Sequence, residues 1–200
     1  MANYRLIRFY ICSVVCHGES EVLLIEHLRK IYRIPIETLS EKNGRRSINI
    51  NTINNYLEAH FPSVDEYIKR FDDCINHERR RLINHKIFAV MDKDDTSDEI
   101  YDKYKNKTLF KSHWWGKDDY IVPIYFYPNM DYVFRKHGFD INTSRDKPQQ
   151  YFKLLSIKSE EVIRMLKSLP KSESNIKELL DYIEYFQKKY NSKLVSGEKK

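Results

Sequence analysis

A short apolar run at residues 87–91 is followed directly by Asp92, Lys93 and Asp94. Five apolar residues are too few for an ordinary helix, and their β-branched and aromatic side chains favour a strand that is buried on both faces. Such a strand belongs in the middle of a parallel sheet. Because open α/β sheets bind ligands at the carboxyl ends of their strands, the sequence predicts a ligand site at Asp92 and Asp94.

These two carboxylates suit a hard divalent cation. They are one residue apart, so both can turn toward the same ion, and Mg²⁺ prefers one or two carboxylates together with water and phosphate oxygens. Asp92 and Asp94 are therefore candidate ligands of Mg²⁺ or Mn²⁺. The alternative is that the acidic run only caps the helix that follows it, since Asp, Thr and Ser are common at helix starts.

A second apolar run, residues 6–16, ends at His17 and Gly18. Apolar residues at helical spacing follow, so the pattern predicts a strand, a glycine turn and a helix with Glu21 in its first turn. If this strand is a neighbour of the strand at residues 87–91, Glu21 lies above the same sheet edge as the aspartates. Glu21 is therefore a third candidate metal ligand.

The order of these motifs resembles the Toprim domain, in which a strand ending in Glu-Gly-x-x-Asp/Glu precedes a strand ending in Asp-x-Asp. The counterparts here are His-Gly-Glu-Ser-Glu at residues 17–21 and Asp-Lys-Asp at residues 92–94. The resemblance covers roughly residues 5–135 and is greatest to the small RloB-like and overcoming-lysogenisation-defect-like proteins. It implies a metal-dependent nuclease of DNA or RNA, acting in phage defence, in which Glu21, Asp92 and Asp94 hold Mg²⁺ or Mn²⁺.

The sequence departs from the family pattern at His17, which stands where the family carries a glutamate. Histidine can transfer protons near neutral pH, but it cannot offer Mg²⁺ a hard anionic oxygen. Glu19 either takes the place of that glutamate or is an ordinary solvated charge. The candidate catalytic residues are therefore His17, Glu19 and Glu21. The alternative function is a catalytically inactive nucleic-acid-binding or regulatory protein derived from the Toprim domain.

A basic loop supplies candidate phosphate contacts. Arg45 and Arg46 follow a glycine, in a loop that we expect to lead into a helix with Ser47 as its N-cap. Backbone N–H groups at a helix start bind phosphate, and arginine adds a guanidinium fork that matches two phosphate oxygens. Arg45 and Arg46 are therefore candidate contacts to nucleic acid. The alternative is that both are solvated loop charges.

A second candidate surface for nucleic acid lies in residues 104–116, where lysines alternate with aromatic side chains. Grooves that bind single-stranded nucleic acid combine these residue types, because bases stack on rings while ammonium groups follow the phosphates. Lys111 and Trp114 are the candidate contacts. The alternative is that Phe110, Trp114 and Trp115 are ordinary core residues.

One further connection between a strand and a helix brings another acidic residue. A strand is predicted over residues 120–126, and Pro123 argues that it is not hydrogen-bonded along both edges. Asn129 opens the next helix, with Asp131 in the first turn. Asp131 either adds a carboxylate to the site or only stabilises the helix start.

Composition limits the partners and the location. The net charge of +6 and the pI near 9.0 favour a partner with phosphates, in agreement with DNA or RNA. No apolar run approaches the ~20 residues of a membrane span, so the sequence predicts a cytoplasmic protein without membrane contact. Cys12, Cys16 and Cys74 are an odd set, so we expect no structural disulfide. Cys12 and Cys16 are interpreted as buried apolar residues, with a zinc site beside His17 as the alternative.

Length and pattern predict an α/β domain with a short, mainly parallel sheet of four strands, and the resemblance implies that its three-layer fold is Toprim-like. The strands are expected near residues 6–16, 34–39, 87–91 and 120–126. We place the α/β domain at residues 1–139, a helical C-terminal extension packed on it at residues 140–192, and a disordered tail at residues 193–200. The resemblance leaves room for a protein partner of a defence system and for oligomers.

Overall fold

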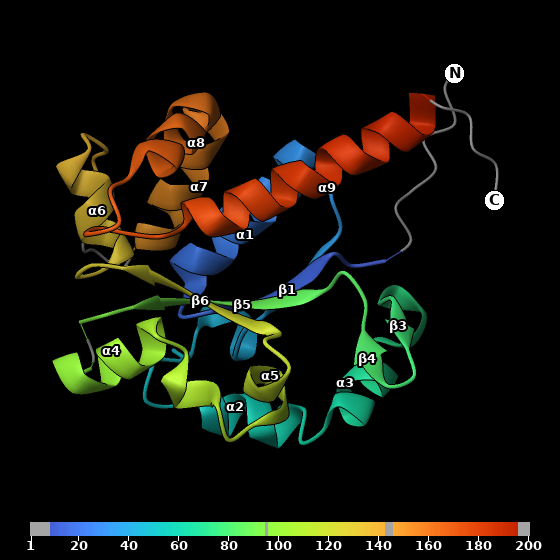
Figure 1. Cartoon of the computed structure of the whole chain (residues 1–200). Coiled ribbons are helices and arrows are strands. Elements are labelled where there is room, and N and C mark those ends of the chain that lie inside the picture. The colour runs from blue at the N-terminus through green and yellow to red at the C-terminus, as the bar shows by residue number, and fades with distance from the viewer. Residues whose placement is uncertain (1–8, 95, 143–145, 196–200) are drawn as a thin grey trace.

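The computed structural model describes residues 9–94, 96–142 and 146–195. Its centre is a sheet of four parallel strands in the order β2–β1–β5–β6. The strands are β1 (Cys12–Cys16), β2 (Ile36–Leu39), β5 (Lys86–Asp92) and β6 (Ile121–Phe126). Helices cover both faces of the sheet (Figure 1), which confirms the predicted three-layer α/β class, with a Rossmann-like arrangement.

The helices form one layer above the sheet and one below it in the view of Figure 1. The upper layer contains α1 (Glu19–Tyr32), α6 (Met130–Lys136), α7 (Lys147–Ile157), α8 (Ser159–Ser168) and α9 (Lys177–Val195). The lower layer contains α2 (Ile53–His60), α3 (Val64–Phe71), α4 (Asp98–Lys105) and α5 (Trp114–Lys117). Shorter elements are three 3-10 turns, η1 (Lys42–Gly44), η2 (Asp72–Cys74) and η3 (Thr108–Phe110), and a hairpin of β3 (His77–Glu78) and β4 (Arg81–Leu82).

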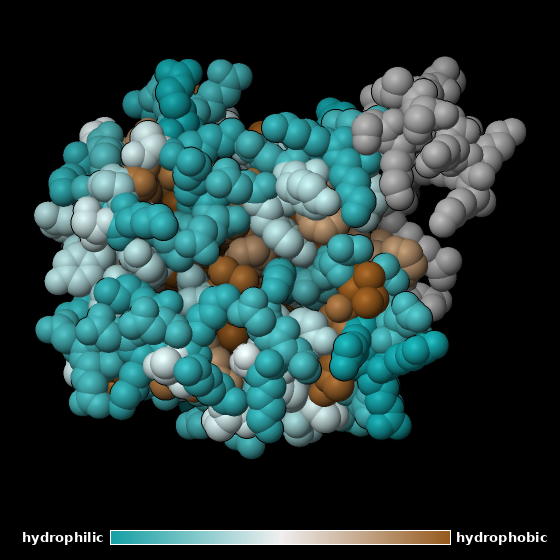
Figure 2. All heavy atoms as spheres, viewed as in Figure 1, coloured by the Kyte–Doolittle hydropathy of each residue, from teal (hydrophilic) through white to brown (hydrophobic). Residues whose placement is uncertain are grey.

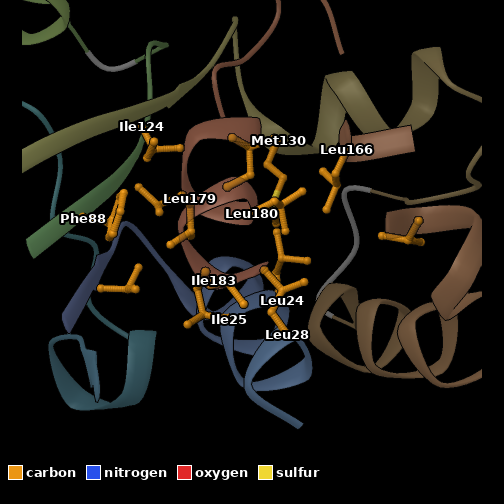
Figure 3. Close-up of a cluster of buried hydrophobic side chains, with 14 of the residues drawn as sticks. Leu24, Ile25, Leu28, Phe88, Ile124, Met130, Leu166, Leu179, Leu180 and Ile183 are labelled. Carbon is orange, nitrogen blue, oxygen red and sulfur yellow. The ribbon is translucent and has the colours of Figure 1, made fainter. Parts of the chain in front are cut away.

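The strands send alternate side chains into two separate cores, as the period of two along a strand requires. Val14 and Phe88 face the upper core, and Val15 and Ala89 face the lower one. Figure 3 shows the upper core, where side chains of α1, α6, α8 and α9 meet those of β5 and β6. From the side shown in Figure 2 the surface is mostly hydrophilic, and hydrophobic atoms are visible in the recess between the two helical layers.

The four predicted strands are confirmed in the sheet, with boundaries that differ by one or two residues except at the first strand, where the difference is larger. β5 lies between β1 and β6 as expected of a strand buried on both faces, and β6, which contains Pro123, is at an edge. The first strand begins at Cys12, so the prediction of a strand from residue 6 is wrong for residues 9–11. Residues 6–8 lie outside the described part of the chain.

Both cysteines of β1 are buried in the upper core, as the sequence predicts for small apolar side chains. Burial raises the pKa of the Cys12 thiol, and it raises the pKa of Cys16 well above the ordinary value of a thiol. Cys12 and Cys16 lie at opposite ends of β1, four residues and so roughly 13 Å apart along the strand, which is too far for both thiolates to bind one zinc ion. This spacing opposes the alternative of a zinc site formed by both cysteines and His17.

The C-terminal helices share the upper core with the sheet. α7 packs on α1, and α9 crosses above the sheet, where the Tyr182 hydroxyl lies 3.1 Å from the carbonyl oxygens of both Ile11 and Asn84 and shares its one proton between them. α9 ends at Val195, so the predicted disordered tail is wrong for residues 193–195, while residues 196–200 lie outside the described part. Within the described ranges, no helix has the length and apolar character needed to cross a bilayer.

Candidate functional site

The sheet register brings the two predicted motifs to the same edge. Cys16 at the end of β1 is level with Val90 of β5, and the next residue, His17, donates its backbone N–H to the Val90 carbonyl at 3.0 Å. Asp92 ends β5 two residues further on. The glycine turn before α1 and the aspartates after β5 are therefore neighbours, as the sequence predicts.

Glu21 is held in place by the start of α1. Its side chain is only 3% exposed, and its Oε2 accepts a hydrogen bond from the Gly18 backbone N–H at 2.9 Å. This contact is half of a capping box, in which the third helical residue satisfies the N–H of the N-cap. The carboxylate is thereby fixed above the carboxyl edge of the sheet.

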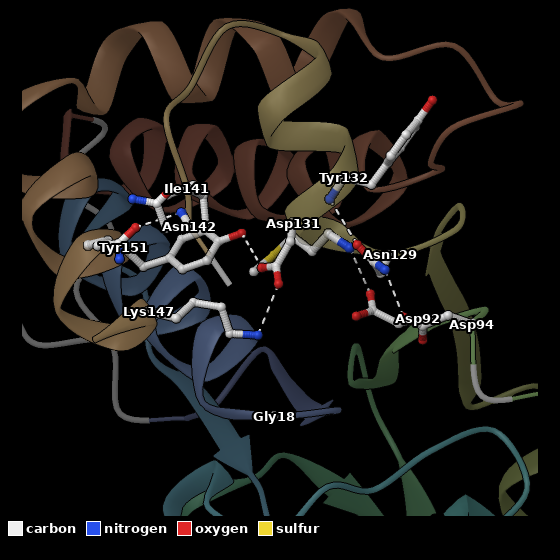
Figure 4. Close-up of polar contacts among 12 residues, drawn as sticks. Gly18, Asp92, Asp94, Asn129, Asp131, Tyr132, Ile141, Asn142, Lys147 and Tyr151 are labelled. Atoms are coloured by element: carbon white, nitrogen blue, oxygen red, sulfur yellow. Dashed lines mark hydrogen bonds and ion pairs between the residues drawn. The ribbon is translucent and has the colours of Figure 1, made fainter. Parts of the chain in front are cut away.

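Asp92 and Asp94 are held from the other side by the start of α6 (Figure 4). The Met130 backbone N–H donates to Asp92 Oδ1 at 3.0 Å, and the Asn129 side-chain amide donates to Asp94 Oδ2 at 2.7 Å. Asn129 Oδ1 also accepts from the Tyr132 N–H at 2.8 Å, which confirms Asn129 as the N-cap of α6. One residue thus caps a helix and orients a candidate metal ligand.

The electrostatics of Asp92 show that the acidic groups are close neighbours. Burial raises the pKa of Asp92 well above its ordinary value, and the negative charge of Glu21 is the second cause. The hydrogen bond from Met130 acts in the opposite direction, while Asp94 and Asp131 raise the pKa further. Asp92 is therefore a desolvated carboxylate among like charges.

Glu21 is in the same situation, and His17 acts on it. Burial raises the pKa of Glu21, and Asp131 adds to the increase. The His17 side chain is the main influence that lowers this pKa, which places the imidazole within electrostatic reach of the carboxylate. Glu21, Asp92, Asp94 and Asp131 are defined here as the carboxylate cluster.

Sequence reasoning left two roles open for Asp131, and it missed the groups that contact this residue. The Lys147 ammonium lies 3.0 Å from Asp131 Oδ2, and the Tyr151 hydroxyl donates to Asp131 Oδ1 at 2.9 Å (Figure 4). Burial acts to lower the pKa of Lys147, but the contact with Asp131 and the charges of Glu21 and Asp92 outweigh it, so the pKa is raised. Asp131 therefore belongs to the cluster.

The basic loop lies against the start of α1. Gly44 has φ +82°, and a Cβ at this position would lie 2.6 Å from the Glu19 Cα, so only glycine allows the close approach. Arg46 forms an ion pair with Glu41 at 2.8 Å, whereas Arg45 is exposed and has no ion pair within the described ranges. The loop brings Arg45 to the side of the site.

One part of this prediction is wrong: the loop does not lead directly into a helix. α2 begins at Ile53 with Thr52 as its N-cap, so Ser47 is not an N-cap. The backbone at residue 48 instead donates to the His17 carbonyl at 2.9 Å, which ties the segment to the β1 turn. Any phosphate contact here therefore depends on guanidinium groups and not on a helix start. Glu19, the first residue of α1, is half-buried beside the same loop.

Lys111 and Trp114 are not brought to the carboxyl edge. The Trp114 indole N–H donates to the Phe61 carbonyl at 2.8 Å, and its ring lies edge-on to Tyr120, 6.0 Å between centroids. Tyr120 directly precedes the first residue of β6, and Asp92 pairs with Phe126 at the last. The length of β6, roughly 16 Å, therefore separates Trp114 from the carboxyl edge. Trp115 and Phe110 are buried core residues, and Lys111 is exposed on the lower layer. A role of Lys111 and Trp114 in nucleic-acid binding stays a prediction.

The donor chemistry of the cluster fits a hard divalent cation. Within the part of the chain that the structure describes, no three His, Cys, Asp or Glu side chains converge as ready-made metal ligands. The cluster nevertheless offers only oxygen donors, and its burial and like charge oppose ionisation of Glu21 and Asp92. A cation would stabilise the ionised carboxylates, as Mg²⁺ and Mn²⁺ sites require.

Comparisons with known proteins give no relative: no protein-family model matches the sequence, and no match was found among the curated proteins or the solved structures.

Proposed function

We propose that the protein is a Toprim-type, metal-dependent nuclease that hydrolyses phosphodiester bonds of DNA or RNA. The observation that supports the proposal most is the meeting of Glu21, which is buried, and Asp92, which is partly buried, at the carboxyl ends of neighbouring strands, both with raised pKa. Burying like charges costs stability, so a purely structural role would favour neutral side chains at these positions. Perturbed carboxylates at a ligand-binding sheet edge are typical of functional sites.

Five of the candidate residues have a role in this proposal. Glu21, Asp92 and Asp94 would hold Mg²⁺ or Mn²⁺, which supplies positive charge at the phosphate and an activated water when bound. His17, within electrostatic reach of Glu21, is suited to hold or transfer a proton. Arg45, exposed beside the start of α1, is suited to bind a phosphate oxygen of the substrate.

The assignment to the Toprim class is supported by the order of the motifs on the fold. The strand–glycine turn–helix unit and the Asp-Lys-Asp segment lie on the two central strands of a four-stranded parallel sheet. The resemblance to RloB-like proteins further supports a role in phage defence. Nucleic acid as the substrate agrees with the net charge of +6.

A second candidate function is a Toprim-derived protein that binds nucleic acid and does not cleave it. Two observations favour it: His17 replaces the glutamate of the family pattern, and the described carboxylates do not already form a converged metal site. In this case the basic loop would carry the function, and the carboxylate cluster would not be needed.

A cleavage assay separates the two functions. Single- and double-stranded DNA and RNA are incubated with Mg²⁺, Mn²⁺ or a chelator. The nuclease proposal expects metal-dependent cleavage that falls by roughly 10³-fold in Asp92→Asn. Asp102→Asn, an exposed aspartate of α4 paired with Lys105, is the matched control and should retain activity. Binding without cleavage of any substrate, or equal cleavage by wild type and Asp92→Asn, would reject the nuclease.

A further inference from the structure

The carboxylate cluster contains its own cation, supplied by the C-terminal helices. Lys147 is the first residue of α7, and its half-buried ammonium forms the ion pair with Asp131. Glu21 and Asp92 also act on this ammonium electrostatically, so its charge is shared with the cluster and not confined to one partner. Figure 4 shows Lys147 and Tyr151 reaching Asp131 from α7, while Asp92 and Asp94 lie on the other side.

The place of Lys147 in its helix argues against a purely structural role. A cation in the first turn of a helix faces the positive end of the helix dipole, which disfavours it. Lys147 nevertheless occupies the first position of α7, and Asp146, its N-cap, makes no side-chain capping bond. The ammonium is therefore at a position where α7 itself gains nothing from it, and its favourable interactions are with the cluster.

The neighbouring lysine has its main partner outside the cluster. Lys93 lies between the two aspartates in sequence, but its ammonium pairs with Asp98 at 2.8 Å on the side of α4. This pairing is the largest cause of the raised pKa of Lys93, to which Asp94 also contributes. Lys147 thus approaches from the upper layer, and Lys93 turns away toward the lower one. α7 packs on α1, which carries Glu21, so the position of Lys147 is tied to that of a candidate ligand.

We propose that Lys147 is a resident counter-ion that competes with a divalent cation for the carboxylate cluster and so sets the metal affinity of the site. This inference rests on the proposed metal site and concerns how the affinity of that site for metal is regulated. A single ammonium partly neutralises the cluster, so a divalent cation that enters must act against this positive charge. Removing the charge of Lys147 should therefore strengthen metal binding, whereas removing a structural ion pair should weaken it or leave it unchanged.

The test is a calorimetric titration of the full chain with Mn²⁺ alone. Lys147→Gln and Lys147→Met remove the charge, and methionine keeps most of the apolar stem in case glutamine disturbs packing. Both should bind Mn²⁺ on the order of tenfold more tightly than wild type, because a unit charge a few ångströms from a divalent ion is removed. Lys147→Arg keeps the charge, and Lys153→Gln removes an exposed charge of α7 away from the cluster; both should bind as wild type does.

Thermal melts of each variant show that the folded protein is being titrated. If both neutral variants bind Mn²⁺ no more tightly than wild type, Lys147 is only a structural partner of Asp131 and the inference is wrong, although the metal site stands. If neither wild type nor the neutral variants bind Mn²⁺, the metal site fails and the inference fails with it. Binding by the neutral variants alone supports the counter-ion.

Discussion

The two edges of the sheet bury polar groups in opposite ways. At the amino edge the Tyr67 hydroxyl donates to Ser13 Oγ at 2.6 Å, and His85 Nε2 lies 2.9 Å from the same hydroxyl. His85 Nδ1 lies 3.1 Å from the Tyr10 carbonyl, so these uncharged groups satisfy one another. At the carboxyl edge the buried Glu21 and the partly buried Asp92 are carboxyl groups whose like charges oppose each other.

This difference indicates which edge serves stability and which serves function. A fully matched neutral network stabilises a fold, because no buried polar atom lacks a partner. Buried like charges cost stability, and proteins keep them where a ligand or reaction needs them. The amino edge also has a recess of about 320 Å³ with aromatic residues such as Tyr120, Tyr182 and Phe186 in its lining, in contrast to the acidic character of the other edge.

The largest predicted effect concerns His85 at the amino edge. Burial lowers the pKa of His85 to about 4, whereas an unfolded histidine has a pKa of about 6.5. Between these values the unfolded chain binds a proton that the native protein does not. The free energy of unfolding should therefore carry a contribution of roughly 3 kcal/mol that is present above pH ~6.5 and is lost as the pH falls toward 4. Urea denaturation between pH 4 and 7 measures it.

The control for this prediction is a second histidine. His60→Gln removes an exposed imidazole and should keep the wild-type pH dependence, whereas His85→Gln should remove the part of the slope that belongs to this window. A slope that is the same in His85→Gln and wild type would show that the buried network does not exclude the proton.

The sequence predicts the elements of the carboxyl edge well because their signals are local. A five-residue apolar run with aspartates behind it indicates a buried strand, and Glu21 follows from a glycine turn and helical spacing. The contacts of Asp131 with Lys147 and Tyr151 could not be predicted. These residues follow Asp131 by 16 and 20 positions in the sequence and lie on a different helix, beyond a linker. Only the fold brings α7 to the cluster.

Two predictions are wrong for a related reason: Ser47 as the N-cap of a helix, and residues 9–11 as part of the first strand. Ile48 and Ile50 are buried, so the apolar spacing that indicates a helix is produced by an irregular segment whose backbone bonds to the β1 turn. Residues 9–11 continue the apolar pattern of β1, but the Tyr10 N–H donates to the Cys74 carbonyl, outside the sheet. Tertiary hydrogen bonds override local pattern at both places.

The second prediction tests the close packing that holds the basic loop at the carboxyl edge. Gly44→Ala should lower the free energy of unfolding by roughly 2 kcal/mol or more, because the residue has positive φ and its Cβ would clash with the Glu19 backbone. Gly138→Ala is the matched control: its φ is also positive, +86°, but its Cβ meets no atom within 4 Å. Equal losses in the two variants, by urea denaturation, would mean that the loop does not depend on this contact.

The third prediction is that a substitution of a buried residue stabilises the protein, whereas most substitutions of buried residues destabilise it. Glu21→Gln keeps an oxygen for the Gly18 N–H but removes a buried charge, so the free energy of unfolding at pH 7 should rise by about 1 kcal/mol in the absence of metal. Glu19→Gln is the control, in the same helical turn and half-buried. Its free energy of unfolding should not rise, because the substitution removes only a favourable charge at the helix start. Destabilisation by Glu21→Gln would show that the carboxylate is a structural group.

The smallest predicted effect distinguishes the two arginines of the loop. Arg46 is already paired with Glu41, so the exposed Arg45 should be the better phosphate contact. Arg45→Ala should reduce the dependence of nucleic-acid affinity on log salt by about 0.9, the value for one phosphate contact to a duplex, and Arg46→Ala should reduce it less. Fluorescence anisotropy at several salt concentrations measures both slopes. A larger change for Arg46→Ala would reverse the assignment.

We propose that the carboxyl edge, unlike the amino edge, binds a divalent cation. A calorimetric titration with Mn²⁺ decides this, with wild type, the double variant Asp92→Asn plus Asp94→Asn, and Asp102→Asn as the exposed control. The predicted result is binding in the micromolar-to-millimolar range for wild type and control, lost in the double variant. Equal Mn²⁺ binding by wild type and the double variant would contradict the claim.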